Sequence, residues 1–92
     1  MSKNVSKEHA FWFCNNKGWV GQIAHSLDEF ANQVKVVPIE SLEFHLRDGR
    51  NDFEAWLVNV MQEKRLAKRA AKIKKEGFRG EDLRKALIGL FE

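Results

Sequence analysis

The sequence predicts an α+β domain in which a short N-terminal antiparallel β-hairpin packs on four to five α-helices. Two β-prone aromatic runs flank a glycine-containing turn, and the apolar residues after them repeat with a helical period. The chain has no internal repeat and no Pro/Gly/Ser-rich linker. We therefore expect a flexible tail over residues 1–8 and one compact domain over residues 9–92.

The hairpin is predicted from residues 10–14 and 19–24, which are rich in aromatic and β-branched side chains. Asn15, Asn16, Lys17 and Gly18 separate the two runs, and Gly18 suits a turn position with positive φ. A two-stranded ribbon is marginal alone, so its aromatic surface is expected to pack on helices.

The first helix is predicted to begin at a capping box, in which the Ser26 hydroxyl accepts from the Glu29 amide and the Glu29 carboxylate reaches back. Its buried stripe follows as Leu27, Phe30, Ala31 and Val34. Pro38 suits the start of a second helix, which would bury Ile39, Leu42 and Leu46, leave Phe44 more lateral, and end at Asp48 and Gly49.

The third helix has the clearest period, with Asn51 or Asp52 as its cap and Phe53, Trp56, Leu57, Val60 and Met61 as its inner face. Residues 64–75 are predicted to form a lightly buried helix on a thin stripe of Leu66, Ala70 and Ile73. A last helix follows Glu81 and Asp82 and buries Leu83, Ala86, Leu87, Leu90 and Phe91.

Composition excludes several classes of protein. Hydrophobic residues make up 43% and aromatic residues 11%, which is too high for a disordered chain. The lone Cys14 cannot form an internal disulfide, and no apolar run approaches the roughly 20 residues that span a bilayer. We expect a cytoplasmic protein without a signal peptide or a membrane contact.

His45 with Asp48 and Asp52 is the nearest approach to a catalytic or metal-binding cluster. The structural interpretation is favoured, with Asp52 at a helix start, Asp48 in a turn, and His45 bonded to backbone or to one of these acids. Cys14 lies on an aromatic strand and fits a small buried hydrophobe. With no phosphate loop, nucleophile elbow or dinucleotide motif, we expect no enzyme, no cofactor and no metal.

The charge is concentrated in one segment. Seven of the sixteen Lys and Arg residues fall within residues 64–75, which contain no acid. At helical spacing, one side of this segment could follow a phosphate backbone, which makes its cations candidate nucleic-acid contacts: Lys64, Arg65, Lys68, Arg69, Lys72 and Lys75. The alternative is a solvated helix neutralised by acids elsewhere, such as Glu40, Glu43 or Glu54.

The hairpin aromatics allow a further alternative. Exposed rings of Phe11, Trp12, Phe13 and Trp19 could stack single-stranded bases, but Lys17 is the only cation of the hairpin. Aromatic pairs on a ribbon more often pack against helices, which is the favoured interpretation.

A resemblance to a known family rests on two runs with two upstream elements: Ser41-Leu42-Glu43-Phe44-His45-Leu46, Asp52-Phe53-Glu54-Ala55-Trp56-Leu57, Gly21, and Ser26-Leu27-Asp28-Glu29-Phe30. The pattern is similar to a family of small uncharacterised domains found in archaea and bacteria. The resemblance supports one compact domain and carries over no catalytic or binding residue, because that family has no assigned activity.

The sequence thus predicts a non-enzymatic binding or adaptor domain, a subunit of a larger assembly with a protein partner. The alternative is a nucleic-acid- or ribonucleoprotein-associated accessory protein that uses the basic helix. A small enzyme around His45 is the remote alternative.

Overall fold

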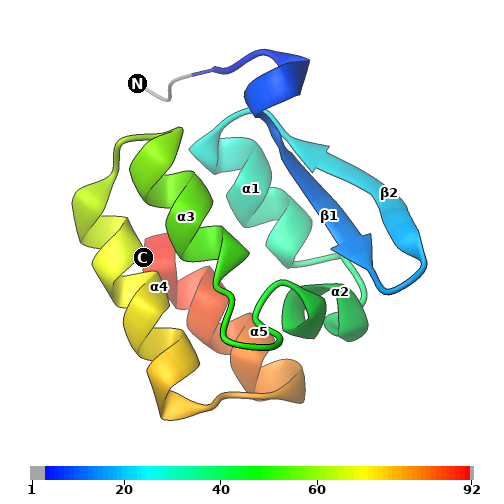
Figure 1. Cartoon of the computed structure of the whole chain (residues 1–92), viewed down its shortest axis with the longest axis vertical. Helices are drawn as coiled ribbons and strands as arrows, with labels where there is room; N and C mark the ends of the chain where they lie inside the picture. The colour runs from blue at the N-terminus through cyan, green and yellow to red at the C-terminus, as the bar shows by residue number, and fades with distance from the viewer. Residues whose placement is uncertain (1–3, 92) are drawn as a thin grey trace.

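The structure, a computed structural model, describes residues 4–91. It confirms the predicted α+β fold, a hairpin followed by helices (Figure 1). The elements follow the chain as η1 (Lys7–His9), β1 (Phe11–Asn15), β2 (Gly18–Ala24), α1 (Leu27–Val34), α2 (Ile39–Phe44), α3 (Asp52–Asn59), α4 (Lys64–Glu76), α5 (Gly80–Ile88) and η2 (Gly89–Phe91).

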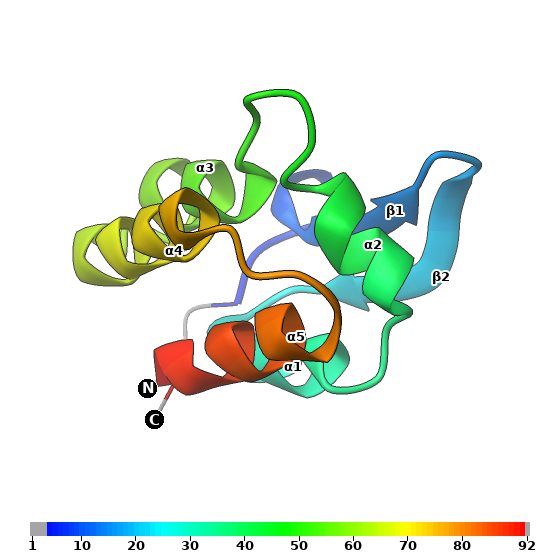
Figure 2. The same cartoon turned by 90° about the horizontal axis from the view of Figure 1, so that it is seen from below.

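The helices form two layers beside the hairpin. Figure 2 shows α3 and α4 in one layer and α1 and α5 in the other, with α2 next to the strands. α1 packs on β2, α2 packs on β1 and α5, and α3 packs on α4. As a result, α4 and the hairpin lie on opposite sides of the molecule.

Aromatic rings fill the centre of the core. The Phe11 ring centroid lies 5.4 Å from that of Phe30, 5.3 Å from that of Phe53 and 5.7 Å from that of Trp56. Phe30 stacks on Trp56 at 5.3 Å. The Trp56 indole N–H donates to the carbonyl of His9 at 2.8 Å. One core therefore joins the ribbon to α1 and α3, as a marginal two-stranded hairpin requires.

The hairpin contains a bulge that the residue pattern does not predict. Trp12 pairs with Ile23 and Cys14 pairs with Trp19, so residues 20–22 of β2 lie opposite Phe13 alone. Gly21 in this bulge has φ of 98°, a conformation that favours glycine. The extra residues bring the rings of Trp12 and Trp19 to a centroid distance of 5.0 Å.

The predicted caps of α1 and α3 are present, with one difference. The Ser26 hydroxyl accepts from the Glu29 amide at 3.1 Å, but the Glu29 carboxylate accepts from the amide of His25 and not from that of Ser26. This hydrogen bond lowers the pKa of Glu29. At α3, Asn51 is the cap, because its side-chain oxygen accepts from the Glu54 amide at 3.0 Å.

The buried stripe of α4 differs from the predicted one by one position. Ala67, Ala70 and Ile73 are buried, whereas Leu66 is half-buried at the border of the stripe. The side-chain N–H of Asn51 donates to the carbonyl of Ala70 at 3.1 Å, so one residue both caps α3 and holds α4.

The predicted tail is only partly described, because residues 1–3 lie outside the described residues. Within residues 4–8, the Val5 amide donates to the carbonyl of His25 at 2.8 Å. Lys7 lies over the Trp12 ring at 5.6 Å and accepts the Trp12 indole N–H through its carbonyl. These contacts tie the segment to the hairpin. Among the described residues, no helix is both long and apolar enough to span a membrane.

Candidate functional site

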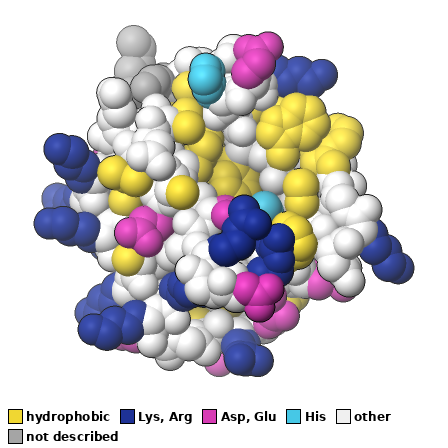
Figure 3. Space-filling model, viewed as in Figure 1, with side chains coloured by type: hydrophobic (Ala, Val, Ile, Leu, Met, Phe, Trp, Pro, Cys, Tyr) yellow, Lys and Arg dark blue, Asp and Glu magenta, His cyan; other side chains and the backbone are white. Residues whose placement is uncertain are grey.

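The outer surface of α4 is a row of exposed cations, which we call the basic face of α4: Lys64, Arg65, Lys68, Lys72 and Lys75. At 3.6 residues per turn these positions fall within an arc of about 100°, and they extend over about 16 Å of helix. Figure 3 shows Lys and Arg side chains along the left edge of the molecule, where α4 lies in Figure 1. Five of the six predicted contact residues therefore share one exposed face.

The other two cations of α4 hold the helix in place. Arg69, the sixth predicted contact residue, donates through Nη1 to the Leu90 carbonyl at 3.0 Å and through Nη2 to the Gly89 carbonyl at 2.8 Å. Lys74 donates through Nζ to the carbonyl of Leu46. These charged donors satisfy carbonyls at the ends of α5 and α2.

The basic face of α4 has no acidic partner within residues 4–91. Two ion pairs, Arg50–Asp52 and Arg84–Glu81, and two histidine–carboxylate contacts, His25–Glu29 and His45–Asp52, occur in that part of the chain, and none includes α4. Of the acids predicted to neutralise the helix, Glu43 instead accepts from the Gly80 amide at the start of α5. The positive charge of the face is thus left to solvent or to a partner.

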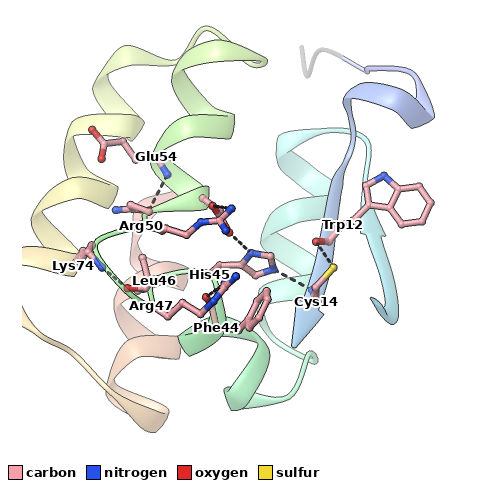
Figure 4. A network of polar contacts seen from close by, with 11 residues as sticks. Trp12, Cys14, Phe44, His45, Leu46, Arg47, Arg50, Glu54 and Lys74 are labelled. Atoms are coloured by element: carbon pink, nitrogen blue, oxygen red, sulfur yellow. Dashed lines mark hydrogen bonds and ion pairs between the residues drawn. The ribbon is translucent and has the colours of Figure 1, made fainter. Parts of the chain in front are cut away.

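A second polar cluster surrounds His45, which is buried between α2, α3 and β1 (Figure 4). Its Nε2 accepts from the backbone N–H of Cys14 at 3.0 Å, and its Nδ1 lies 2.8 Å from Asp52 Oδ2. Because Nε2 faces a donor, the proton of the neutral ring is on Nδ1 and is donated to Asp52. Arg50 donates to the other oxygen of Asp52 at 3.1 Å.

Cys14, His45 and Asp52 therefore lie in a row, as a nucleophile, a base and an orienting acid do in a catalytic triad. They lack the hydrogen bond between nucleophile and base that such a triad needs. The nitrogen that would take the thiol proton is occupied by an amide, and the thiol itself points to the Trp12 carbonyl at 3.5 Å. Burial raises the pKa of the Cys14 thiol, and desolvation lowers the pKa of His45 despite Asp52. The arrangement suits the joining of three elements better than nucleophilic chemistry.

Asp48, the third member of the predicted cluster, does not join it. It is exposed in the turn after α2 with φ of 51°. Within residues 4–91 there is no group of three or more His, Cys, Asp or Glu residues that could hold a metal ion.

A cavity of about 360 Å³ opens between the end of α2 and the connection from α4 to α5. Its walls mix cations, acids and apolar side chains, and the lining residues are Glu43, Leu46, Arg47, Asp48, Lys74, Gly77, Phe78, Arg79 and Leu83. Sequence reasoning missed this site, because its residues come from two segments, 43–48 and 74–83, that are far apart in the sequence and meet only in the folded chain. The only local signal was the Gly77–Gly80 connection with an apolar Phe78 inside it.

The hairpin aromatics are divided between two faces. Phe11 and Phe13 are buried in the core, whereas Trp19 is 54% exposed and Trp12 is half-buried beside it. A four-ring stacking platform is therefore ruled out by strand alternation, and one pair of Trp rings forms the outer face.

The family model that matches this chain is described as a family of unknown function, DUF5752, and it covers residues 1–92. The chain belongs to this family. The predicted resemblance to a family of small uncharacterised domains is thereby confirmed, and membership of DUF5752 assigns no activity. No curated protein and no solved structure matches the chain.

Proposed function

We propose that this DUF5752 domain is a non-enzymatic binding module that contacts nucleic acid through the basic face of α4. One observation carries the proposal: five exposed cations line one side of a single helix without an acidic partner within residues 4–91. Lys and Arg side chains in such a row can neutralise successive phosphates and release their counterions.

The placement of these cations costs the helix stability, which supports a role outside folding. Lys64 and Arg65 lie in the first turn, at the positive end of the helix dipole, and α4 has no acid there and no side-chain cap. Lys64, Lys68 and Lys72 repel one another at i, i+4 spacing. Residues that lower the stability of the helix on which they lie are typical of functional surfaces.

The environment of His45 supports a non-enzymatic role. Its Nε2 is engaged by the Cys14 amide, and its Nδ1 proton is engaged by Asp52, so neither nitrogen faces a substrate. A buried polar group with both positions satisfied rigidifies the fold.

The test replaces Lys64, Lys68 and Lys72 with Gln and measures binding of RNA and of duplex DNA against salt. Each lost phosphate contact should reduce the slope of log affinity against log salt by about 0.9 on duplex DNA, for every sequence alike. The melting temperature of the triple variant should not be lower than that of the wild type, because the three lysines are exposed and repel one another.

The matched control replaces Lys17, Lys35 and Lys85, three exposed lysines outside α4, with Gln. This variant has the same change in net charge, and it should retain most of the affinity and the salt slope. An equal loss in both variants, or no binding by the wild type at low salt, would refute the proposal.

A protein-binding adaptor is the second candidate function, and the exposed Trp pair favours it. The indole N–H groups of Trp12 and Trp19 are bonded to the carbonyls of Lys7 and Gln22, which fixes both rings on the outer face of the hairpin. Fixed aromatic rings at a surface are typical of protein interfaces. A wild type that binds neither RNA nor DNA would leave this candidate as the better one.

A further inference from the structure

We infer that the cavity at the end of α4 holds one nucleotide of a single strand, with the base on Phe78 and the phosphate on Arg79 and its neighbours. The inference deepens the proposed nucleic-acid function and rests on it, since the rest of the strand would follow the basic face of α4. Its ligand is a nucleotide, in which a sugar joins a planar base to a phosphate group.

The charge of the cavity wall favours an anionic ligand. Arg47, Lys74 and Arg79 line the wall, and no ion pair within residues 4–91 includes any of them. Of the two lining acids, Glu43 is committed to the amide of Gly80. Asp48 is then left to accept from a sugar hydroxyl or a base amino group.

Two of these cations are held in position before any ligand arrives. Arg47 lies over the Phe44 ring at 3.6 Å and donates through Nη1 to the Phe44 carbonyl at 2.7 Å. Lys74 is fixed by the Leu46 carbonyl, and Figure 4 shows Leu46 between the Lys74 and Arg47 side chains. Each side chain keeps further N–H donors for a phosphate, at a reduced entropic cost of binding.

The apolar part of the wall favours a planar ring. Phe78 is 38% exposed although it is a large aromatic residue, and it lies between Gly77 and Arg79 on the short connection from α4 to α5. An aromatic side chain next to an arginine is the combination that proteins use to stack an unpaired base and bind its phosphate. A volume of about 360 Å³ is within the range of small-ligand sites.

The position of the cavity connects it to the proposed interface. Lys74 and Gly77 of its wall are at the C-terminal end of α4, one turn or less from Lys72 and Lys75 of the basic face. A strand that follows the face to the C-terminal end of α4 would turn through about 100° around the helix, the step from Lys75 to Lys74, to reach the cavity. A duplex cannot place a stacked base there, so the site discriminates in favour of single strands.

The experiment measures binding of a short oligouridine and of a DNA duplex to Phe78→Ala and Arg79→Gln. Phe78→Ala should weaken oligouridine binding by about 5- to 150-fold and leave duplex binding unchanged. Val36→Ala is the matched control, because Val36 is also an exposed apolar residue but does not line the cavity.

Failure of this inference is distinguishable from failure of the proposed function. If the α4 triple variant loses affinity while Phe78→Ala binds oligouridine like wild type, the nucleotide site is refuted and the basic face stands. If the wild type binds neither oligouridine nor duplex DNA, the nucleotide site and the proposed nucleic-acid function are both refuted.

A nuclear magnetic resonance titration with uridine monophosphate and with inorganic phosphate identifies the recognised group. Amide shifts of residues 77–79 with the nucleotide alone support the site. Equal shifts and affinity with phosphate alone would show that the base is not recognised, and would overturn the inference.

Discussion

The imidazole Nε2 of His45 accepts a hydrogen bond from the backbone amide of Cys14 at 3.0 Å, which joins the end of α2 to strand β1. A protonated ring would carry N–H groups on both nitrogens and would turn one of them toward the Cys14 donor. The groups that face the ring are Asp52, Arg47 and Arg50, and desolvation outweighs the attraction of Asp52, so the pKa of His45 is lowered.

This geometry predicts that mild acid destabilises the domain. Because the pKa of His45 is lower in the folded protein than its unfolded value of about 6.5, the unfolded chain binds more protons below that pH. The contribution of His45 to the free energy of unfolding should be constant above about pH 7.5 and should be lost as the pH decreases through the folded pKa. Urea denaturation between about pH 5 and 7.5 measures it, with His45→Gln as the non-titrating control. A parallel pH dependence in both proteins would contradict the assignment.

Trp56→Ala should destabilise the domain by about 3 to 5 kcal/mol, because the indole is 6% exposed and stacks on Phe30. Trp56→Phe keeps a ring and loses the bond to the His9 carbonyl, so its cost should be about 1 to 3 kcal/mol. Chemical denaturation compares the two variants. A loss below about 1 kcal/mol for alanine would mean that the core is assigned wrongly.

Ser41→Ala should preserve or increase stability. Ser41 is fully buried in α2, and its hydroxyl has no hydrogen-bond partner among the described residues. Alanine removes an unsatisfied polar group and has the higher helix propensity, so we expect a gain of about 0.5 to 1.5 kcal/mol. Thermal denaturation is the measurement. A clear loss would show that the hydroxyl has a partner.

Lys74→Met should cost about 1 to 2 kcal/mol, because it leaves the Leu46 carbonyl without its charged donor. Lys75→Met, one position further on the exposed side, should change the free energy of unfolding by less than about 0.5 kcal/mol. The pair has the same change in charge and composition. Equal values for both variants in urea would show that the Lys74 bond contributes nothing.

Gly21→Ala should weaken the bulge and separate the two indoles. An alanine at φ of 98° is strained by about 1 kcal/mol or more, although no atom obstructs its Cβ. The Trp12–Trp19 contact is detectable as coupled indole bands in circular dichroism, and we expect these bands to decrease. Gly89→Ala is the control, since Gly89 has a helical φ of −62°. Unchanged indole bands in Gly21→Ala would show that the contact between Trp12 and Trp19 does not depend on the bulge.

Local patterns predicted the hairpin, the helix order and the cap at Ser26, since these depend on neighbours within four residues. Local patterns did not show whether Asn51 or Asp52 caps α3. Asn51 is the cap, and the Asp52 carboxylate is instead bonded to His45, a residue that only the tertiary fold brings near. Local patterns also did not separate Arg69 and Lys74 from the other cations of α4. Those two side chains are distinguished by the carbonyls of Leu90 in η2 and of Leu46 after α2, which only the tertiary fold brings near.

The division of the cations on α4 has an evolutionary consequence. Side chains of the basic face contact no other element through a hydrogen bond or ion pair in the described part of the chain, so each can be replaced without a compensating change in the core. Affinity for a polyanion is then adjustable in small steps, one charge at a time. Arg69 and Lys74 have no such freedom, because Arg69 joins α4 to the segment after α5 and Lys74 joins α4 to the segment after α2.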